Sequence, residues 1–222
     1  MARTLSVAAA VHLTHAVVQV VADDAGVEAL HIKGPALDEV LRVVTHPETG
    51  SVAWSRSSTD TDVWVRPQHV ERMIRALRAS GWWIEYHFQD GSPFRHATTL
   101  MHDHFAPVDL HRRFPGIYAD PESAFEAVWQ GRKKAQIAGV DCLVPDLTAQ
   151  RLILVLHAVR SRNSADIDRA YTAVDVLERA AVDELARQVK ADVALAAGTD
   201  RLDDYRGRRE YRLWKAIRDG ES

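Results

Sequence analysis

The chain has 222 residues, of which 46% are hydrophobic and 27% are charged. This length predicts one domain, or one domain with a helical appendage. The formal net charge of -3 argues against general nucleic-acid affinity as the main role, and we expect no specific DNA binding. Cys142 is the only cysteine, so an intramolecular disulfide is excluded. This fits a reducing compartment, and we expect a cytoplasmic protein.

The first predicted element is a helix over residues 6–22. This run is uncharged and rich in Val and Ala, but it also carries the polar residues His12, Thr14, His15 and Gln19. A spanning helix needs about 20 predominantly apolar residues, and this run is too polar for that role. We therefore expect a buried or half-buried soluble helix and no membrane association.

The next part of the chain mixes strand and helix patterns. Residues 29–32 predict a strand, Pro35 begins a predicted helix that reaches Val44, and residues 46–58 predict a loop. Residues 61–65 predict a central strand. Residues 67–80 predict a helix whose apolar stripe is Val70, Met73, Ile74 and Leu77. The remaining predictions are strands over 82–88, 97–101 and 107–112, a helix over 122–129, and a strand over 135–144.

From Asp146 the pattern becomes helical, with Asp146 as the expected N-cap and a second helix over residues 165–188. The predicted fold class is therefore α/β (α+β). Residues 1–145 form the mixed α/β domain, and residues 146–222 form a C-terminal helical region packed on it.

Asp60 and Asp62 are the most informative pair in the sequence. Residues two apart on a strand point to the same face, so both carboxylates meet where a loop enters the strand. Asp109 is another acid within an apolar predicted strand, so three carboxylates converge if the two strands are neighbours. Such charges repel unless a cation lies between them, and Mg²⁺ is bound in this way together with substrate phosphates.

With these residues in place, the sequence resembles the uncharacterised bacterial nucleotidyltransferases of the DNA polymerase beta superfamily. The resemblance covers residues 31–175. Its pieces are His31-Ile32-Lys33-Gly34, Arg56 with Asp60-Thr61-Asp62, Gly81-Trp82, His102 and His104, Val108-Asp109-Leu110-His111, the strand end at residues 140–145, and His157.

The resemblance implies a small mixed palm-like sheet flanked by helices. It also implies transfer of a nucleoside monophosphate from a nucleoside triphosphate to a hydroxyl-bearing acceptor, with Mg²⁺ (or Mn²⁺) as cofactor. In that scheme Asp60, Asp62 and Asp109 are the catalytic and metal-binding residues, and Asp109 can accept the proton of the acceptor hydroxyl. The implied nucleotide-binding residues are Lys33, Gly34, Arg56 and Ser57. The histidines expected to contact substrate are His102, His104 and His111.

Other functions stay open at this point. Many members of the superfamily have Gly-Ser at the phosphate-binding turn, whereas this chain has Gly34-Pro35, and Pro35 removes one N–H donor. A catalytically degenerate module that binds a nucleotide or a partner is therefore one alternative. A metal-dependent phosphohydrolase that uses the same acids is another. The acceptor can be a small molecule, a peptide or RNA.

Overall fold

The computed structural model describes residues 5–45, 52–55, 57–90 and 96–220. Its centre is a five-stranded sheet of order β1-β4-β7-β6-β5. The strands are β1 (Ala29–Ile32), β4 (Thr61–Val65), β5 (Trp83–Tyr86), β6 (Ala97–Met101) and β7 (Val108–His111). β4 and β7 are parallel, and the other neighbouring strands are antiparallel. The mixed α/β class and the predicted positions of these strands are thus confirmed, with ends that differ by one or two residues.

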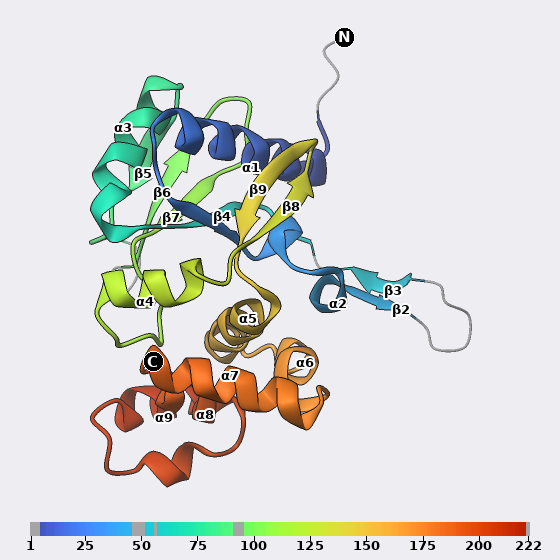
Figure 1. Ribbon diagram of the computed structural model, residues 1–222, viewed down its shortest axis with the longest axis vertical. Coiled ribbons are helices and arrows are strands. Elements are labelled where there is room, and N and C mark those ends of the chain that lie inside the picture. The colour runs from blue at the N-terminus through green and yellow to red at the C-terminus, as the bar shows by residue number, and fades with distance from the viewer. Residues whose placement is uncertain (1–4, 46–51, 56, 91–95, 221–222) are drawn as a thin grey trace.

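The helices α1 (Val7–Asp24) and α3 (Val70–Ala79) cover one face of the sheet (Figure 1). Alternate strand residues such as Val63, Val65 and Leu110 point into this layer and form one core cluster with the buried stripe of α3. A short 3-10 helix, Pro67–His69, precedes α3. A helix that could span a bilayer is absent from the part of the chain that the structure describes.

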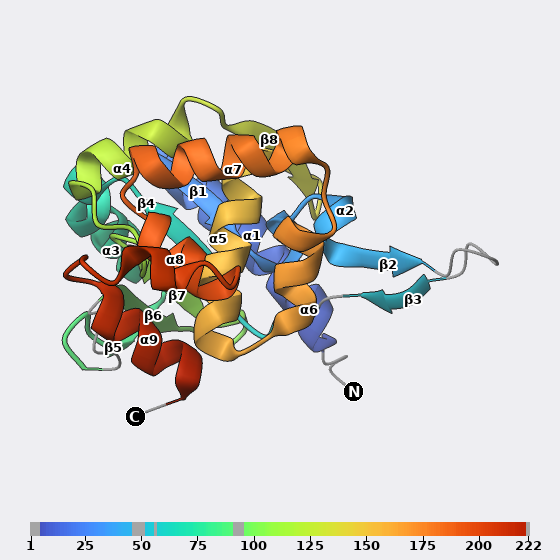
Figure 2. The same ribbon diagram turned by 90° about the horizontal axis from the view of Figure 1, so that it is seen from below.

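Helices from the second half of the chain lie on the opposite side of the sheet. These are α4 (Pro121–Trp129), α5 (Leu147–Ser161), α6 (Ser164–Ile167), α7 (Val176–Gln188), α8 (Asp192–Gly198) and α9 (Tyr211–Asp219). On this side, α7, α8 and α9 pack beneath α5 (Figure 1). α5 runs through the middle of this group (Figure 2). A single larger core joins Leu30 and Trp64 of the sheet to residues of α5 and α8. The helical region therefore packs on the sheet through a continuous apolar interior.

Two hairpins lie outside the central sheet. β2 (Val43–Thr45) pairs with β3 (Val52–Ser55), and this hairpin projects from the body of the molecule (Figures 1 and 2). The predicted helix to Val44 was therefore wrong. The helical part is only the 3-10 turn Gly34–Ala36 and α2 (Glu39–Arg42), because the β-branched run after α2 finds a partner strand. That partner strand lies within the predicted loop.

Two other predicted elements are interrupted. The strand expected over residues 135–144 is a hairpin of β8 (Lys133–Ile137) and β9 (Val140–Val144), which turns at Ala138 and Gly139, both with positive φ. The helix expected over residues 165–188 is split into α6, a π-helix over Asp168–Thr172, and α7. Asp175 starts α7 because its carboxylate accepts hydrogen bonds from the N–H groups of Leu177 and Glu178.

Candidate active site

Asp62 and Asp109 are direct partners in the register of the parallel strands β4 and β7. Both alternate with residues that point toward α1 and α3, so both carboxylates lie on the face that carries Trp64. One ligand atom each from Asp62, Asp109 and His111 lies within 4.8 Å of the other two. The predicted proximity of the two strands is confirmed, and the register brings their acids together.

Asp62 is buried and holds the centre of this group. Its Oδ1 lies 2.5 Å from Nζ of Lys33 and accepts a hydrogen bond of 2.7 Å from Nε2 of His111. Burial alone would raise the pKa of Asp62, but Lys33 and His111 outweigh it and hold that pKa well below its usual range. Asp62 is therefore an ionised carboxylate in a dry environment.

Asp109 has the opposite electrostatic character. Burial raises its pKa, and the charges of Asp62 and Asp60 act in the same direction, while a 2.6 Å hydrogen bond donated by Thr99 Oγ1 opposes them. Burial is the largest cause of this shift, and the neighbouring carboxylates add to it. Two carboxylates and an imidazole within 4.8 Å of one another are donors that divalent cations accept, so the residues present fit a metal site.

Asp60 lies at the entry to β4, at the edge of this group. Its Oδ1 accepts a 2.7 Å hydrogen bond from Ser58 Oγ, and the same hydroxyl donates to the carbonyl of Asp60. Its carboxylate is not among the three groups within 4.8 Å of one another, although its charge contributes to the raised pKa of Asp109. Ser58 thus fixes the position of Asp60 beside the site.

The turn after β1 positions Lys33. Lys33 and Gly34 both have positive φ, of 61° and 49°, and the 3-10 helix that follows has Pro35 in its first turn. A Cβ at Gly34 would lie 3.0 Å from Cβ of Ser58, so only glycine lets the turn approach the loop that carries Asp60. This close approach explains why a glycine follows the lysine.

A buried histidine pair lies behind this turn. Nδ1 of His15 in α1 lies 2.8 Å from Nδ1 of His31 in β1. Burial lowers the pKa of His15 to about 4 and lowers that of His31 well below its ordinary value. Both rings are therefore neutral near pH 7, and one Nδ1 donates to the other.

The helical region contributes a further cation to the site. The guanidinium of Arg160 in α5 lies 5.7 Å from the centre of the Phe114 ring, and that ring lies 6.0 Å from His111. Burial lowers the pKa of Arg160, and the charge of Asp62 opposes this shift. His96 lies 5.2 Å from His111, ring to ring, and its pKa is lowered to about 3 by burial, His111 and Arg160.

Thr99 and Arg160 were not identified from the sequence. Thr99 reaches Asp109 only through the antiparallel register of β6 with β7. Arg160 follows the apolar run of α5. A charged residue at the end of such a run is the sequence feature that could have indicated a role for Arg160.

Two other predicted site residues, His102 and His104, lie away from the three acids, and a third is outside the described residues. His102 contacts the rings of Trp82 and Phe105, on the α1 and α3 side of the sheet, and His104 contacts His102. Their predicted substrate contacts stay predictions. Arg56 lies outside the described residues.

Ser57 is exposed and lines a cavity of about 260 Å³ together with Pro35, Arg42 and His12. This cavity borders the turn that carries Gly34. Its position is compatible with the predicted contact of Ser57 with nucleotide, which also stays a prediction.

Comparison with known proteins defines the class. Residues 7–205 match the model of a family described as uncharacterised nucleotidyltransferase. This match covers most of the chain, so the chain belongs to that family, and the protein is a nucleotidyltransferase. No curated protein matches it.

Solved structures with a similar fold include nucleotidyltransferases. The lincosamide antibiotic adenylyltransferase LnuA, with lincomycin bound, is 18% identical, with 72% of this chain and 94% of that chain covered and a TM-score of 0.45. The antibiotic-resistance factor ANT(2'')-Ia is 14% identical, with 89% and 95% covered and a TM-score of 0.48. A nucleotidyltransferase-like antigenic protein from Paracoccidioides brasiliensis is 13% identical, with 93% and 92% covered and a TM-score of 0.42.

Proposed function

We propose that the protein transfers a nucleoside monophosphate from a nucleoside triphosphate to a hydroxyl group of an acceptor, with Asp60, Asp62 and Asp109 as the catalytic acids. The observation that carries this proposal is the register pairing of Asp62 with Asp109, which puts two buried or half-buried carboxylates and His111 within 4.8 Å. Two carboxylates placed side by side repel each other, and a divalent cation between them would remove that repulsion.

A divalent cation is part of the proposal. Asp62 and Asp109 would hold it, with Asp60 nearby. Mg²⁺ prefers oxygen ligands, so with Mg²⁺ His111 would orient Asp62 through its hydrogen bond, whereas Mn²⁺ also accepts imidazole. The cation supplies positive charge that stabilises the phosphates as the bond at the α-phosphorus changes.

The residues of the chain then have distinct tasks. Lys33 and His111 keep Asp62 ionised, and Thr99 fixes the orientation of Asp109. The acceptor oxygen bonds to the α-phosphorus, the bond from that phosphorus to the bridging oxygen breaks, and pyrophosphate leaves. The proton of the acceptor hydroxyl passes to Asp109, which is half-buried directly beside Asp62.

Mass spectrometry tests the proposal. Wild-type protein and Asp62→Asn are incubated with Mg²⁺ or Mn²⁺, each of the four common nucleoside triphosphates, and acceptor pools of small molecules, peptides and RNA. We expect a product heavier by one nucleoside monophosphate, formed only by the wild type and abolished by EDTA. The accompanying nucleotide then identifies the donor, and the modified pool identifies the acceptor class.

Two other results would point to the alternative functions. Release of phosphate or pyrophosphate without a modified acceptor would indicate a phosphohydrolase. Tight binding of nucleotide to both proteins with no product in any pool would indicate a binding module. Turnover that survives in Asp62→Asn would remove the acids from the mechanism.

A further inference from the structure

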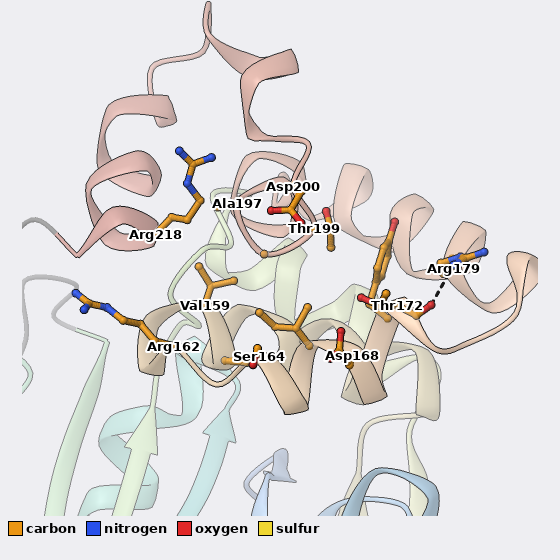
Figure 3. A pocket seen from close by; sticks show the side chains of 14 residues that line it. Val159, Arg162, Ser164, Asp168, Thr172, Arg179, Ala197, Thr199, Asp200 and Arg218 are labelled. Carbon is orange, nitrogen blue, oxygen red and sulfur yellow. Dashed lines mark hydrogen bonds between the residues drawn. The ribbon is translucent and has the colours of Figure 1, made fainter.

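A second cavity lies within the helical region. It has a volume of about 480 Å³, within the range of roughly 300–1,000 Å³ found for small-molecule sites. Figure 3 shows it between the end of α5 with α6 on one side and the segment that follows α8 on the other. Its apolar lining includes Val159, Ile167 and Ala197.

This cavity is separate from the acid site. Its lining includes none of Asp60, Asp62 and Asp109, and neither Lys33 nor His111. Ala158 and Val159 of α5 face the cavity, whereas the next residue, Arg160, borders Phe114 and the surroundings of Asp62. Consecutive helical residues point about 100° apart, so α5 stands between the two sites.

The backbone around the cavity is unusual at three places. Asp168–Thr172 is a π-helix, and Asp168, Tyr171 and Thr172 all line the cavity. Arg162 and Asp200, which also line it, are non-glycine residues with φ of 54° and 55°. Such conformations cost free energy and are enriched at ligand sites.

Charges of both signs line the cavity. Figure 3 shows Arg162 and Arg218 at one end, Asp168 and Asp200 further along on opposite walls, and Arg179 beyond Asp168, where it donates a hydrogen bond to the carbonyl of Thr172. Arg218 is paired with Asp219. The side chains of Arg162, Asp168 and Asp200 form no hydrogen bond or ion pair within the described ranges, and all three are exposed to solvent. They are therefore free to pair with a ligand.

From this arrangement we propose that the cavity binds a zwitterionic small molecule of the amino-acid or short-peptide class. Its ammonium group faces Asp168 and Asp200, its carboxylate faces Arg162 and Arg218, and its aliphatic side chains pack on Val159 and Ile167. A ligand with a single charge would pair either with the two acids or with the two arginines, but not with both sets. The proposal does not depend on the nucleotidyl transfer described above.

Titration calorimetry of the full chain with three probes tests the proposal. The probes are leucyl-leucine, its N-acetyl form without the ammonium group, and its C-terminal amide without the carboxylate. We expect the free dipeptide to bind, and each modified form to bind about tenfold more weakly or worse, since each loses a charge-assisted contact.

Two variants assign the ends of the ligand. Asp200→Asn should lower the preference for the free dipeptide over the N-acetyl form, because only Asp168 remains at the ammonium end. Arg162→Asn should lower the preference for the free dipeptide over the amide, because only Arg218 remains at the carboxylate end. Asn tolerates the left-handed conformation, so both variants are expected to fold, and Asp168→Asn is a second test of the ammonium end. Arg187→Gln, on α7 outside the cavity, and Asp62→Asn should bind like the wild type.

The proposal is overturned if leucyl-leucine does not bind at millimolar concentration. It is also overturned if the amide binds as tightly as the free dipeptide, which would indicate a cation site. Binding that the cavity variants leave unchanged would place the ligand elsewhere. Since Asp62→Asn removes only the acid site, loss of catalysis with retained dipeptide binding separates this proposal from the proposed function.

Discussion

The ammonium of Lys33 and the imidazole of His111 share one oxygen of Asp62. Nζ of Lys33 lies 2.5 Å and Nε2 of His111 lies 2.7 Å from Oδ1. Lys33 reaches that oxygen from the turn after β1, and His111 reaches it from the end of β7. The central acid of the proposed site is thus held from both neighbouring strands of β4.

Lys33→Met should destabilise the protein strongly, because it leaves the buried Asp62 without its cation. Loss of one partner of a buried pair costs about 3–5 kcal/mol. Lys134→Met is the matched control, since its pair with Asp141 is exposed, with 67% and 48% of the two side chains accessible, and such pairs contribute at most about 1 kcal/mol. Urea unfolding at pH 7 without metal measures both. Equal losses would contradict a special role for the Lys33–Asp62 pair.

Asp109→Asn should lower turnover about 10²–10⁴-fold, the usual contribution of a general base. Nucleotide affinity should change much less, because Asp62 remains. Steady-state kinetics and calorimetry separate these two effects. Asp24→Asn, an exposed acid at the end of α1, is the control and should behave like the wild type. Undiminished turnover in Asp109→Asn would assign proton removal to another group.

Arg160→Gln should raise the KM for nucleoside triphosphate about tenfold or more, with a smaller effect on kcat. The reason is the loss of a half-buried cation near Asp62 that can donate charge-assisted hydrogen bonds to phosphate. The KM of Arg160→Lys should lie between that of the wild type and that of Arg160→Gln, because lysine keeps the charge but lacks the planar guanidinium. A KM that is identical in all three proteins would show that α5 does not contact the donor nucleotide.

Gly34→Ala tests the close approach between the turn and the loop that carries Asp60. Gly139→Ala is its control, because both glycines have positive φ but a Cβ at Gly139 has nothing within 4 Å. Both changes should cost about 1–2 kcal/mol through backbone strain. Only Gly34→Ala should also reduce turnover, since its Cβ displaces Ser58, which holds Asp60. Equal turnover in the two variants would refute this coupling.

Stability should fall as the pH drops from about 6.5 toward 4. The pKa of His15 is lowered from 6.5 to about 4, chiefly by burial, so in this range the unfolded chain takes up a proton that the folded chain refuses. The loss from His15 alone is roughly 3 kcal/mol once the pH is below 4. The pKa of His31 is also lowered, so His31 acts in the same direction.

Urea unfolding between pH 7.5 and 4.5 measures this dependence. His15→Asn should reduce the change in the free energy of unfolding with pH, and His87→Asn, at an exposed position, should leave that change as in the wild type. An unaltered slope in His15→Asn would show that other groups carry the acid sensitivity.

The sequence by itself determined the elements whose patterns are local. The apolar stripe of α3 has the period of a helix, and the strand Thr61–Val65 is β-branched and apolar around its acids, so both were predicted correctly. The same pattern marked Asp60, Asp62 and Asp109 as the acids of interest. The predictions of the two elements succeeded because hydrophobic periodicity and strand alternation are properties of neighbouring residues, whereas the catalytic role of the three acids stays a prediction.

Only the tertiary structure decided the rest. Val43–Thr45 became a strand because a partner strand lies beside it, and Thr99 reaches Asp109 through the register of β6 with β7. Arg160 comes to the site because α5 packs under the sheet through the shared core. These relations join residues far apart in the chain, and their free energy depends on packing and on the pairing of buried charges, which no local pattern encodes.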